Sequence, residues 1–152
     1  MAYWLFKTEP GECSIDDFAA APDTAIEWEG VRNYQARNML RDQVKVGDAV
    51  FIYHSSCKLI GVAGIARVVR QAYADPSQFD ATSAYFDGKS LKDNPRWVAV
   101  DLVFERKLPA IIPLDKLKSS AKLNELPLVQ RGSRLSVMPV TPEQWQTILQ
   151  LS

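Results

Sequence analysis

The residues best suited to binding chemistry cluster around one tryptophan. Trp28 stands in the polar, glycine-containing segment Trp28-Glu29-Gly30-Val31, ahead of a helix that Asn33 is expected to cap. An indole offers a flat face on which a nucleobase can stack. The amides of Asn33 and Asn38 each offer a hydrogen-bond donor and an acceptor to a base edge. We expect Trp28 to lie in a loop with its ring open to solvent; a loop tryptophan folded back onto the core is the alternative.

Cations follow the same segment and recur near the C-terminus. Arg32 and Arg37 flank the expected helix start, where backbone N–H groups also favour an anion. Arg134 lies between Ser133 and Ser136, after a glycine. We expect the three arginines and the two serines, Ser133 and Ser136, to contact phosphates. For Arg134, a plain surface charge is the alternative.

Catalytic motifs are weak by comparison. His54-Ser55 is the one histidine beside a hydroxyl, but adjacent strand residues point to opposite faces. Cys57 has no second histidine to activate it. Neither Cys13 nor Cys57 belongs to a metal-binding motif, and the G-x-G-x-x-G and P-loop patterns are missing. We therefore expect no metal, no cofactor and no catalysis. The alternatives are an enzyme acting on nucleic acid or a nucleotide, with His54 and Asp87 as acid and base, and a protein-interaction domain anchored by Trp28.

Composition indicates an ordinary globular chain. The 152 residues are 47% hydrophobic and 24% charged, so we expect one domain over 1–152. The formal net charge of zero argues against a tight nonspecific DNA binder, because such binding depends on releasing counterions from many phosphates. The charge is uneven, however. Residues 1–30 hold seven acids and one lysine, and residues 31–70 hold seven Lys or Arg and two Asp. The middle segment could form an anion-binding face; a solvated surface of mixed charge is the alternative.

The sequence has no signal-peptide pattern and no apolar run approaching the ~18 residues that a membrane-spanning helix needs. We expect a monomeric, cytoplasmic protein with no membrane partner, associated with the nucleoid if bacterial.

Strand patterns outnumber helix patterns and do not alternate with them. This order favours an α+β fold, with a small, mixed and mostly antiparallel β-barrel, closed or nearly closed, surrounded by short helices. Glycines 61 and 64 indicate a bulge or corner. The expected strands are 3–7, 49–53, 59–69, 97–105 and 133–137, the expected helices are 15–21, 34–40, 115–118 and one capped by Thr141, and 73–95 is expected to be a loop.

Five sequence blocks, taken in order, resemble the EVE-domain family of the thymocyte nuclear protein type. The resemblance runs from Met1 to about Leu151 and implies a PUA-like fold, related to the YTH readers of methylated adenosine. It also implies that a modified base, chiefly a modified cytosine in DNA, is flipped into an aromatic pocket; modified RNA is the other candidate. The blocks are Tyr3-Trp4-Leu5-Phe6-Lys7-Thr8-Glu9-Pro10, Trp28-Glu29-Gly30-Val31-Arg32-Asn33-Tyr34-Gln35-Ala36-Arg37-Asn38, Val50-Phe51-Ile52-Tyr53-His54-Ser55, Tyr85-Phe86-Asp87 and Gly132-Ser133-Arg134-Leu135-Ser136-Val137.

The resemblance also implies roles for individual residues. Trp28 would be the stacking wall, and Tyr85 or Phe86 would stand where YTH readers supply a second tryptophan. Position 88 is glycine where the family block has proline. The remaining assignments are Lys7 and Thr8 for the floor, Asn33 and Tyr34 for the rim, His54 and Ser55 for the far side, and Ser133, Arg134 and Ser136 for the phosphates.

Overall fold

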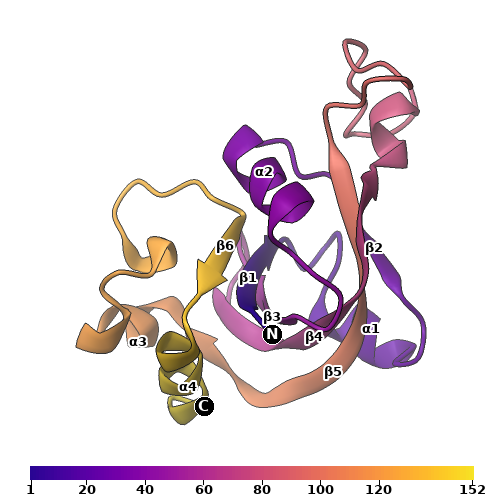
Figure 1. Cartoon of the computed structure of the whole chain (residues 1–152). Coiled ribbons are helices and arrows are strands. Elements are labelled where there is room, and N and C mark those ends of the chain that lie inside the picture. Colours follow the sequence, from indigo (N-terminus) through magenta and orange to yellow (C-terminus); the bar gives the residue numbers. More distant parts are fainter.

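One six-stranded mixed sheet organises the chain, in the order β2-β5-β4-β3-β1-β6 (Figure 1). The computed structural model describes residues 1–152. β1 pairs with β3 in parallel, and every other neighbouring pair is antiparallel. The strands are β1 (Tyr3–Thr8), β2 (Ile26–Trp28), β3 (Ala49–His54), β4 (Gly61–Ala74), β5 (Val98–Pro113) and β6 (Val137–Val140).

The helices are short and lie outside the sheet. The α-helices are α1 (Ile15–Ala20), α2 (Tyr34–Asp42), α3 (Leu114–Lys118) and α4 (Pro142–Gln150), and three 3₁₀ turns cover Pro76–Phe79, Ala121–Leu123 and Pro127–Val129. No helix combines the length and apolarity needed to cross a membrane. The α+β, PUA-like prediction is confirmed, but the sheet curves without closing, because its edge strands β2 and β6 do not pair with each other (Figure 1).

Strand alternation places two cores on opposite faces of the sheet. Trp4 and Phe6 of β1 belong to a cluster covered by α1 and α2, and Leu5 between them belongs to the other cluster. In that second cluster Trp145 of α4 stacks on Phe51 with ring centroids 3.7 Å apart. Both faces of β1 and β3 are therefore sealed, which explains why these strands read as continuous apolar runs.

Helix caps follow the sequence signals. Ser14 accepts a hydrogen bond from the Asp17 N–H at 3.2 Å, and the Asp17 carboxylate accepts one from the Ser14 N–H at 2.8 Å. Thr141 forms the equivalent capping box at α4. Asn33 caps α2 by accepting from the Ala36 N–H at 3.0 Å. α2 begins where predicted and buries Ala36 and Leu40.

The main error of the sequence predictions is that they ended β4 and β5 too early. β4 continues to Ala74 and β5 to Pro113, so the predicted loop over 73–95 begins later and contains a 3₁₀ turn. β6 starts at Val137, where the predicted strand ends. Several register shifts between β4 and β5 account for the first error, because each bulge resets the alternation on which strand prediction relies.

Gly64 lies at such a shift, as predicted, whereas Gly61 begins β4 in regular register opposite Pro113; both allow close approach of neighbouring backbone. A Cβ at Gly61 would overlap the carbonyl of Ile112, whereas one at Gly11 would meet nothing within 4 Å. We expect Gly61→Ala to lower the free energy of unfolding by about 1–3 kcal/mol through overpacking. Urea denaturation measures this, with Gly11→Ala as the matched control. Equal unfolding midpoints for the two variants would contradict the close approach.

Candidate functional site

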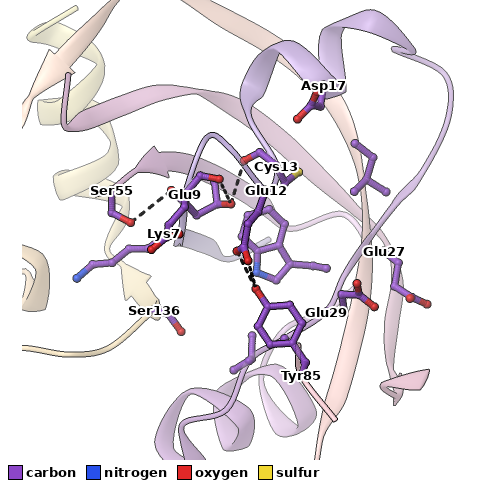
Figure 2. Close-up of a pocket in the computed structure, with 15 residues that line it drawn as sticks. Lys7, Glu9, Glu12, Cys13, Asp17, Glu27, Glu29, Ser55, Tyr85 and Ser136 are labelled. Carbon is purple, nitrogen blue, oxygen red and sulfur yellow. Dashed lines mark hydrogen bonds between the residues drawn. The ribbon is translucent and has the colours of Figure 1, made fainter. Parts of the chain in front are cut away.

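A cleft of about 820 Å³ opens where the sheet fails to close (Figure 2). One side is formed by β2 and the residues after it, and the other by the end of β1 and the residue before β6. Six predicted site residues line it: Lys7, Thr8, Trp28, Ser55, Tyr85 and Ser136. Nine lining residues were not predicted: Glu9, Glu12, Cys13, Asp17, Ile26, Glu27, Glu29, Gly30 and Val31.

Trp28 forms the floor of this cleft, and the expectation of an open loop indole is wrong. It ends β2, paired with Val100, and is 7% exposed. Its ring packs on Phe6 and Phe18 with centroids 5.5 and 6.4 Å away. The reason is local: β2 adds to the edge of the sheet and turns Trp28 into the core between α1 and β1. Only a small part of the indole is left for a ligand.

Tyr85 is the second aromatic wall. Three of its ring carbons would lie 2.7–2.8 Å from a Cβ on Gly30, so the ring lies over that glycine, which also has a φ of +85°. Its hydroxyl lies 2.7 Å from both carboxylate oxygens of Glu12, on the opposite wall (Figure 2). Burial, followed by the Glu12 hydrogen bond, raises the pKa of Tyr85 to about 12. Phe86, the other candidate, is 47% exposed and does not line the cleft.

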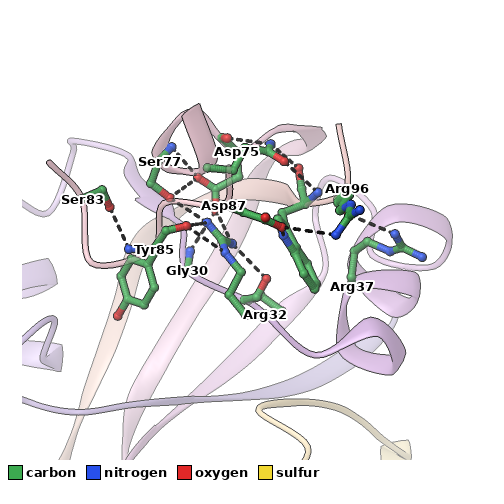
Figure 3. Close-up of polar contacts among 12 residues, drawn as sticks. Gly30, Arg32, Arg37, Asp75, Ser77, Ser83, Tyr85, Asp87 and Arg96 are labelled. Atoms are coloured by element: carbon green, nitrogen blue, oxygen red, sulfur yellow. Dashed lines mark hydrogen bonds and ion pairs between the residues drawn. The ribbon is translucent and has the colours of Figure 1, made fainter. Parts of the chain in front are cut away.

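Arg32 holds the Tyr85 loop in place instead of offering its charge to a phosphate (Figure 3). Its guanidinium donates to the Tyr85 carbonyl at 2.8 and 3.1 Å, to the Val31 carbonyl at 3.0 Å and to the Ser77 hydroxyl at 3.1 Å. It also pairs with Asp75, whose side chain is fully buried, at 3.0 Å. All five N–H donors are used. The prediction of Arg32 as a phosphate ligand is therefore wrong.

The start of α2 lies beside the cleft rather than in it. The Asn33 amide oxygen is used as the helix cap, and Tyr34, 51% exposed, stacks on Trp97 at 4.8 Å. Arg37 lies over the Tyr34 ring and donates to the Asn38 amide oxygen at 2.8 Å. None of these four predicted residues of α2 and its cap lines the cleft. Asn33, Tyr34 and Asn38 are exposed and Arg37 is partly exposed, and Figure 3 shows Arg37 on the side of Arg32 that faces away from Tyr85.

His54 has a structural partner. Its Nε2 accepts the backbone N–H of Ile15 at 3.1 Å, and burial lowers its pKa, so the neutral imidazole is favoured. Asp87, its suggested catalytic partner, instead accepts the indole N–H of Trp97 at 2.8 Å. No contact joins His54 to Asp87. Ser55 lines the cleft and His54 does not, in keeping with their opposite directions along the strand.

The C-terminal segment contributes one residue to the cleft. Ser136 lines it, and its carbonyl accepts the Lys7 N–H at 2.8 Å. Ser133 and Arg134 do not line it. Arg134 is exposed and takes part in no hydrogen bond or ion pair with the rest of the chain. Only Leu135 separates it from Ser136, so its Cα lies within ~7 Å of the Cα of that cleft residue.

Charge is the feature of the cleft that motif reading missed. Five carboxylates line it, and all come from the acid-rich first 30 residues. Lys7 is the one lining cation, and burial lowers its pKa. The signal was present in the charge count of that segment, but we interpreted only the basic segment that follows. Three of the seven cations of that segment, Arg32, Arg41 and Arg67, are each paired with a carboxylate, and none of the seven lines the cleft.

The cleft does not contain an activated nucleophile. Cys13 is the lining thiol, and burial, with the nearby charges of Asp17 and Glu12, raises its pKa to about 11. The protonated thiol is a poor nucleophile. What the cleft offers is an aromatic wall, an indole edge and an excess of hydrogen-bond acceptors.

A curved, open mixed sheet with helices on both faces and a cleft at its gap defines a PUA-like α+β domain. The chain belongs to the EVE domain family, whose model matches residues 2–151.

Relatives of known sequence and structure agree with this assignment. The chain is 40% identical to human thymocyte nuclear protein 1 over 167 residues, covering 99% of this chain and 73% of that protein. A crystal structure from Pseudomonas putida is 54% identical with a TM-score of 0.95, covering 99% of both chains. The crystal structure of the human THYN1 protein in complex with 5-methylcytosine-containing DNA is 39% identical with a TM-score of 0.93, covering 99% and 97%.

Trp28 provides a test of the cleft floor. A solvent-exposed loop indole could be truncated with little change in the melting temperature, whereas the contacts of Trp28 with Phe6 and Phe18 predict a large loss of stability. Truncation should lower the free energy of unfolding by about 3–5 kcal/mol, because it leaves a cavity in the core. Chemical denaturation measures the loss, and Trp28→Phe should recover most of it. A Trp28→Ala variant as stable as the wild type would show that the ring does not support the core.

Proposed function

We propose that this domain reads a modified cytosine in DNA, taken out of the base stack into the cleft, without chemical change. The observation that carries the proposal is the cleft itself, which has an aromatic wall and lies in a chain 39% identical to a protein solved with 5-methylcytosine-containing DNA. A volume of about 820 Å³ falls within the ~300–1,000 Å³ of small-molecule sites. The human structure contains DNA, which favours DNA over RNA as the partner.

Stacking on Tyr85 is the main attractive contribution in this proposal. Flipping a base costs a few kcal/mol, and one base–aromatic stack returns ~1–3 kcal/mol. The Arg32 cluster and Gly30 hold the ring in place before a ligand arrives, so little conformational entropy is lost on binding. Trp28 contributes its edge, not its face.

Phosphates are expected to stay at the rim. Carboxylates inside the cleft repel a backbone, and the predicted cations Arg32 and Arg37 already donate to protein groups. Arg134 is the predicted phosphate ligand that is still free. With few available cations, affinity should depend weakly on salt, in keeping with the neutral net charge.

Tyr85→Ala tests the aromatic wall. We expect it to weaken binding of a 5-methylcytosine oligonucleotide about tenfold, because one stack is lost. Fluorescence anisotropy measures the affinity, and Tyr85→Phe should keep most of it. Phe86→Ala is the matched control, since it removes a neighbouring exposed ring outside the cleft. Equal losses for Tyr85→Ala and Phe86→Ala would contradict the assignment.

Arg134→Ala tests the rim. We expect weaker binding of modified and unmodified strands by the same factor, and a plot of log affinity against log salt that is flatter by about one charge. Lys122→Ala, an exposed cation on another segment, is the control. A salt slope unchanged by Arg134→Ala would remove this residue from the contact surface.

A further inference from the structure

The floor of the cleft carries a hydrogen-bond donor without a partner. The indole N–H groups of Trp4 and Trp97 donate to Asp48 and Asp87, at 2.9 and 2.8 Å. The N–H groups of Trp28 and Trp145 donate to no group of the protein, although these residues are only 7% and 5% exposed, and of the two only Trp28 lines the cleft. No fully buried polar side-chain atom lacks a partner, so the Trp28 N–H is reached from the cleft that Trp28 lines. If a bound ligand covered this N–H without accepting a hydrogen bond from it, the complex would be destabilised.

The β2 side of the cleft carries a carboxylate whose nearest polar neighbours are mostly other carboxylates. Glu12 accepts from Tyr85, and Glu27 accepts from the Tyr73 hydroxyl at 2.6 Å. Glu29 lines the cleft and forms no ion pair. Burial raises the pKa of Glu29, the charges of Asp75 and Glu27 and a side-chain hydrogen bond with Glu27 raise it further, and the charge of Arg32 lowers it. An incoming N–H donor would relieve this unfavourable environment.

We propose that Glu29, together with the indole N–H of Trp28, makes the cleft selective for a base with an exocyclic amine beside a ring acceptor, cytosine rather than thymine. The inference rests on the proposed function and names the residue that sets its specificity. The amine at C4 would donate to the Glu29 carboxylate, and N3 or the O2 carbonyl would accept from the indole.

Thymine is the sharpest competitor, because it carries the same 5-methyl group as 5-methylcytosine. Held in the same orientation, it presents a carbonyl oxygen in place of the amine, and an N–H in place of the ring acceptor. The carboxylate then faces an acceptor and is left unpaired, and an indole N–H directed at N3 loses its acceptor as well. A site built on hydrogen bonds rejects such an analogue more strongly than a site built on shape.

The side of the cleft opposite Glu29 does not offset the preference for an amine over a carbonyl. Lys7 is the one cation that could favour a carbonyl, and Figure 2 shows its amine extending away from Glu29 and Tyr85, toward the far side of the cleft. Acceptors therefore dominate around Glu29. Glu27, beside it, adds negative charge but is already engaged by Tyr73.

The experiment compares oligonucleotides that differ at one base. DNA duplexes carry 5-methylcytosine or thymine opposite an abasic position, so extrusion breaks no base pair in either case. A third duplex carries abasic positions on both strands and measures backbone binding alone. Wild-type protein should prefer 5-methylcytosine over thymine by about tenfold or more.

Glu29→Gln should bring this ratio close to one, because an amide can donate to the thymine carbonyl as well as accept from an amine. The lost charge also weakens repulsion of phosphates, so the ratio of the two affinities is the readout, rather than either affinity. Glu125→Gln, the same substitution at an exposed position outside the cleft, should leave the ratio at its wild-type value. Glu29 is exposed, and thermal melting checks that the variant is folded.

The outcomes separate the two proposals. If wild-type protein binds 5-methylcytosine no better than the doubly abasic duplex, the proposed function fails. The proposed function stands, and the role of Glu29 is overturned, in two cases. In the first, the protein binds the 5-methylcytosine duplex more tightly than the doubly abasic duplex but no more tightly than the thymine duplex. In the second, Glu29→Gln leaves the preference for 5-methylcytosine over thymine intact.

Discussion

The buried ion pair between Arg32 and Asp75 is the constraint on which the cleft depends. Asp75 is fully buried and also accepts the Gly30 N–H at 2.9 Å and the Ser77 N–H at 2.8 Å. Arg32, held by Asp75, donates in turn to the Tyr85 carbonyl and so fixes the position of the Tyr85 loop. One carboxylate thus fixes two walls of the cleft, the glycine turn after β2 and the loop that bears Tyr85. Removing Arg32 would leave the Asp75 carboxylate buried without its counter-ion, which is far more costly than losing a surface ion pair.

The two ends of the cleft show different ways of presenting an aromatic ring. Trp28 is rigid because the core encloses its faces, and it offers only its edge. Tyr85 is rigid because polar groups hold its backbone and Glu12 holds its hydroxyl, and its ring stays accessible. The first arrangement suits a hydrogen bond, and the second suits stacking. A planar ligand can use both at once.

The fold could be predicted from sequence more fully than the site. Caps at Ser14, Asn33 and Thr141, and the bulge at Gly64 of β4, are local signals, and they hold in the structure. The site depends on partners far apart in the chain. Nothing near position 32 shows that Asp75 will neutralise its arginine, so a buried structural cation was interpreted as a phosphate ligand. Similarly, the burial of Trp28 follows from the pairing of β2 with β5, which the sequence of that short segment does not encode.

The open edge of the sheet has a mechanical consequence. β2 and β6 share no ladder hydrogen bonds, so side chains set the spacing of the two sides of the cleft: the Trp28 ring packed on Phe6 at the floor, and the hydroxyl of Tyr85 against Glu12 above it. Widening the cleft slightly above its floor therefore breaks one exposed contact and leaves the backbone ladder intact. A closed barrel would have a fixed bore, whereas this architecture can adjust to substituents of different bulk without unfolding any strand.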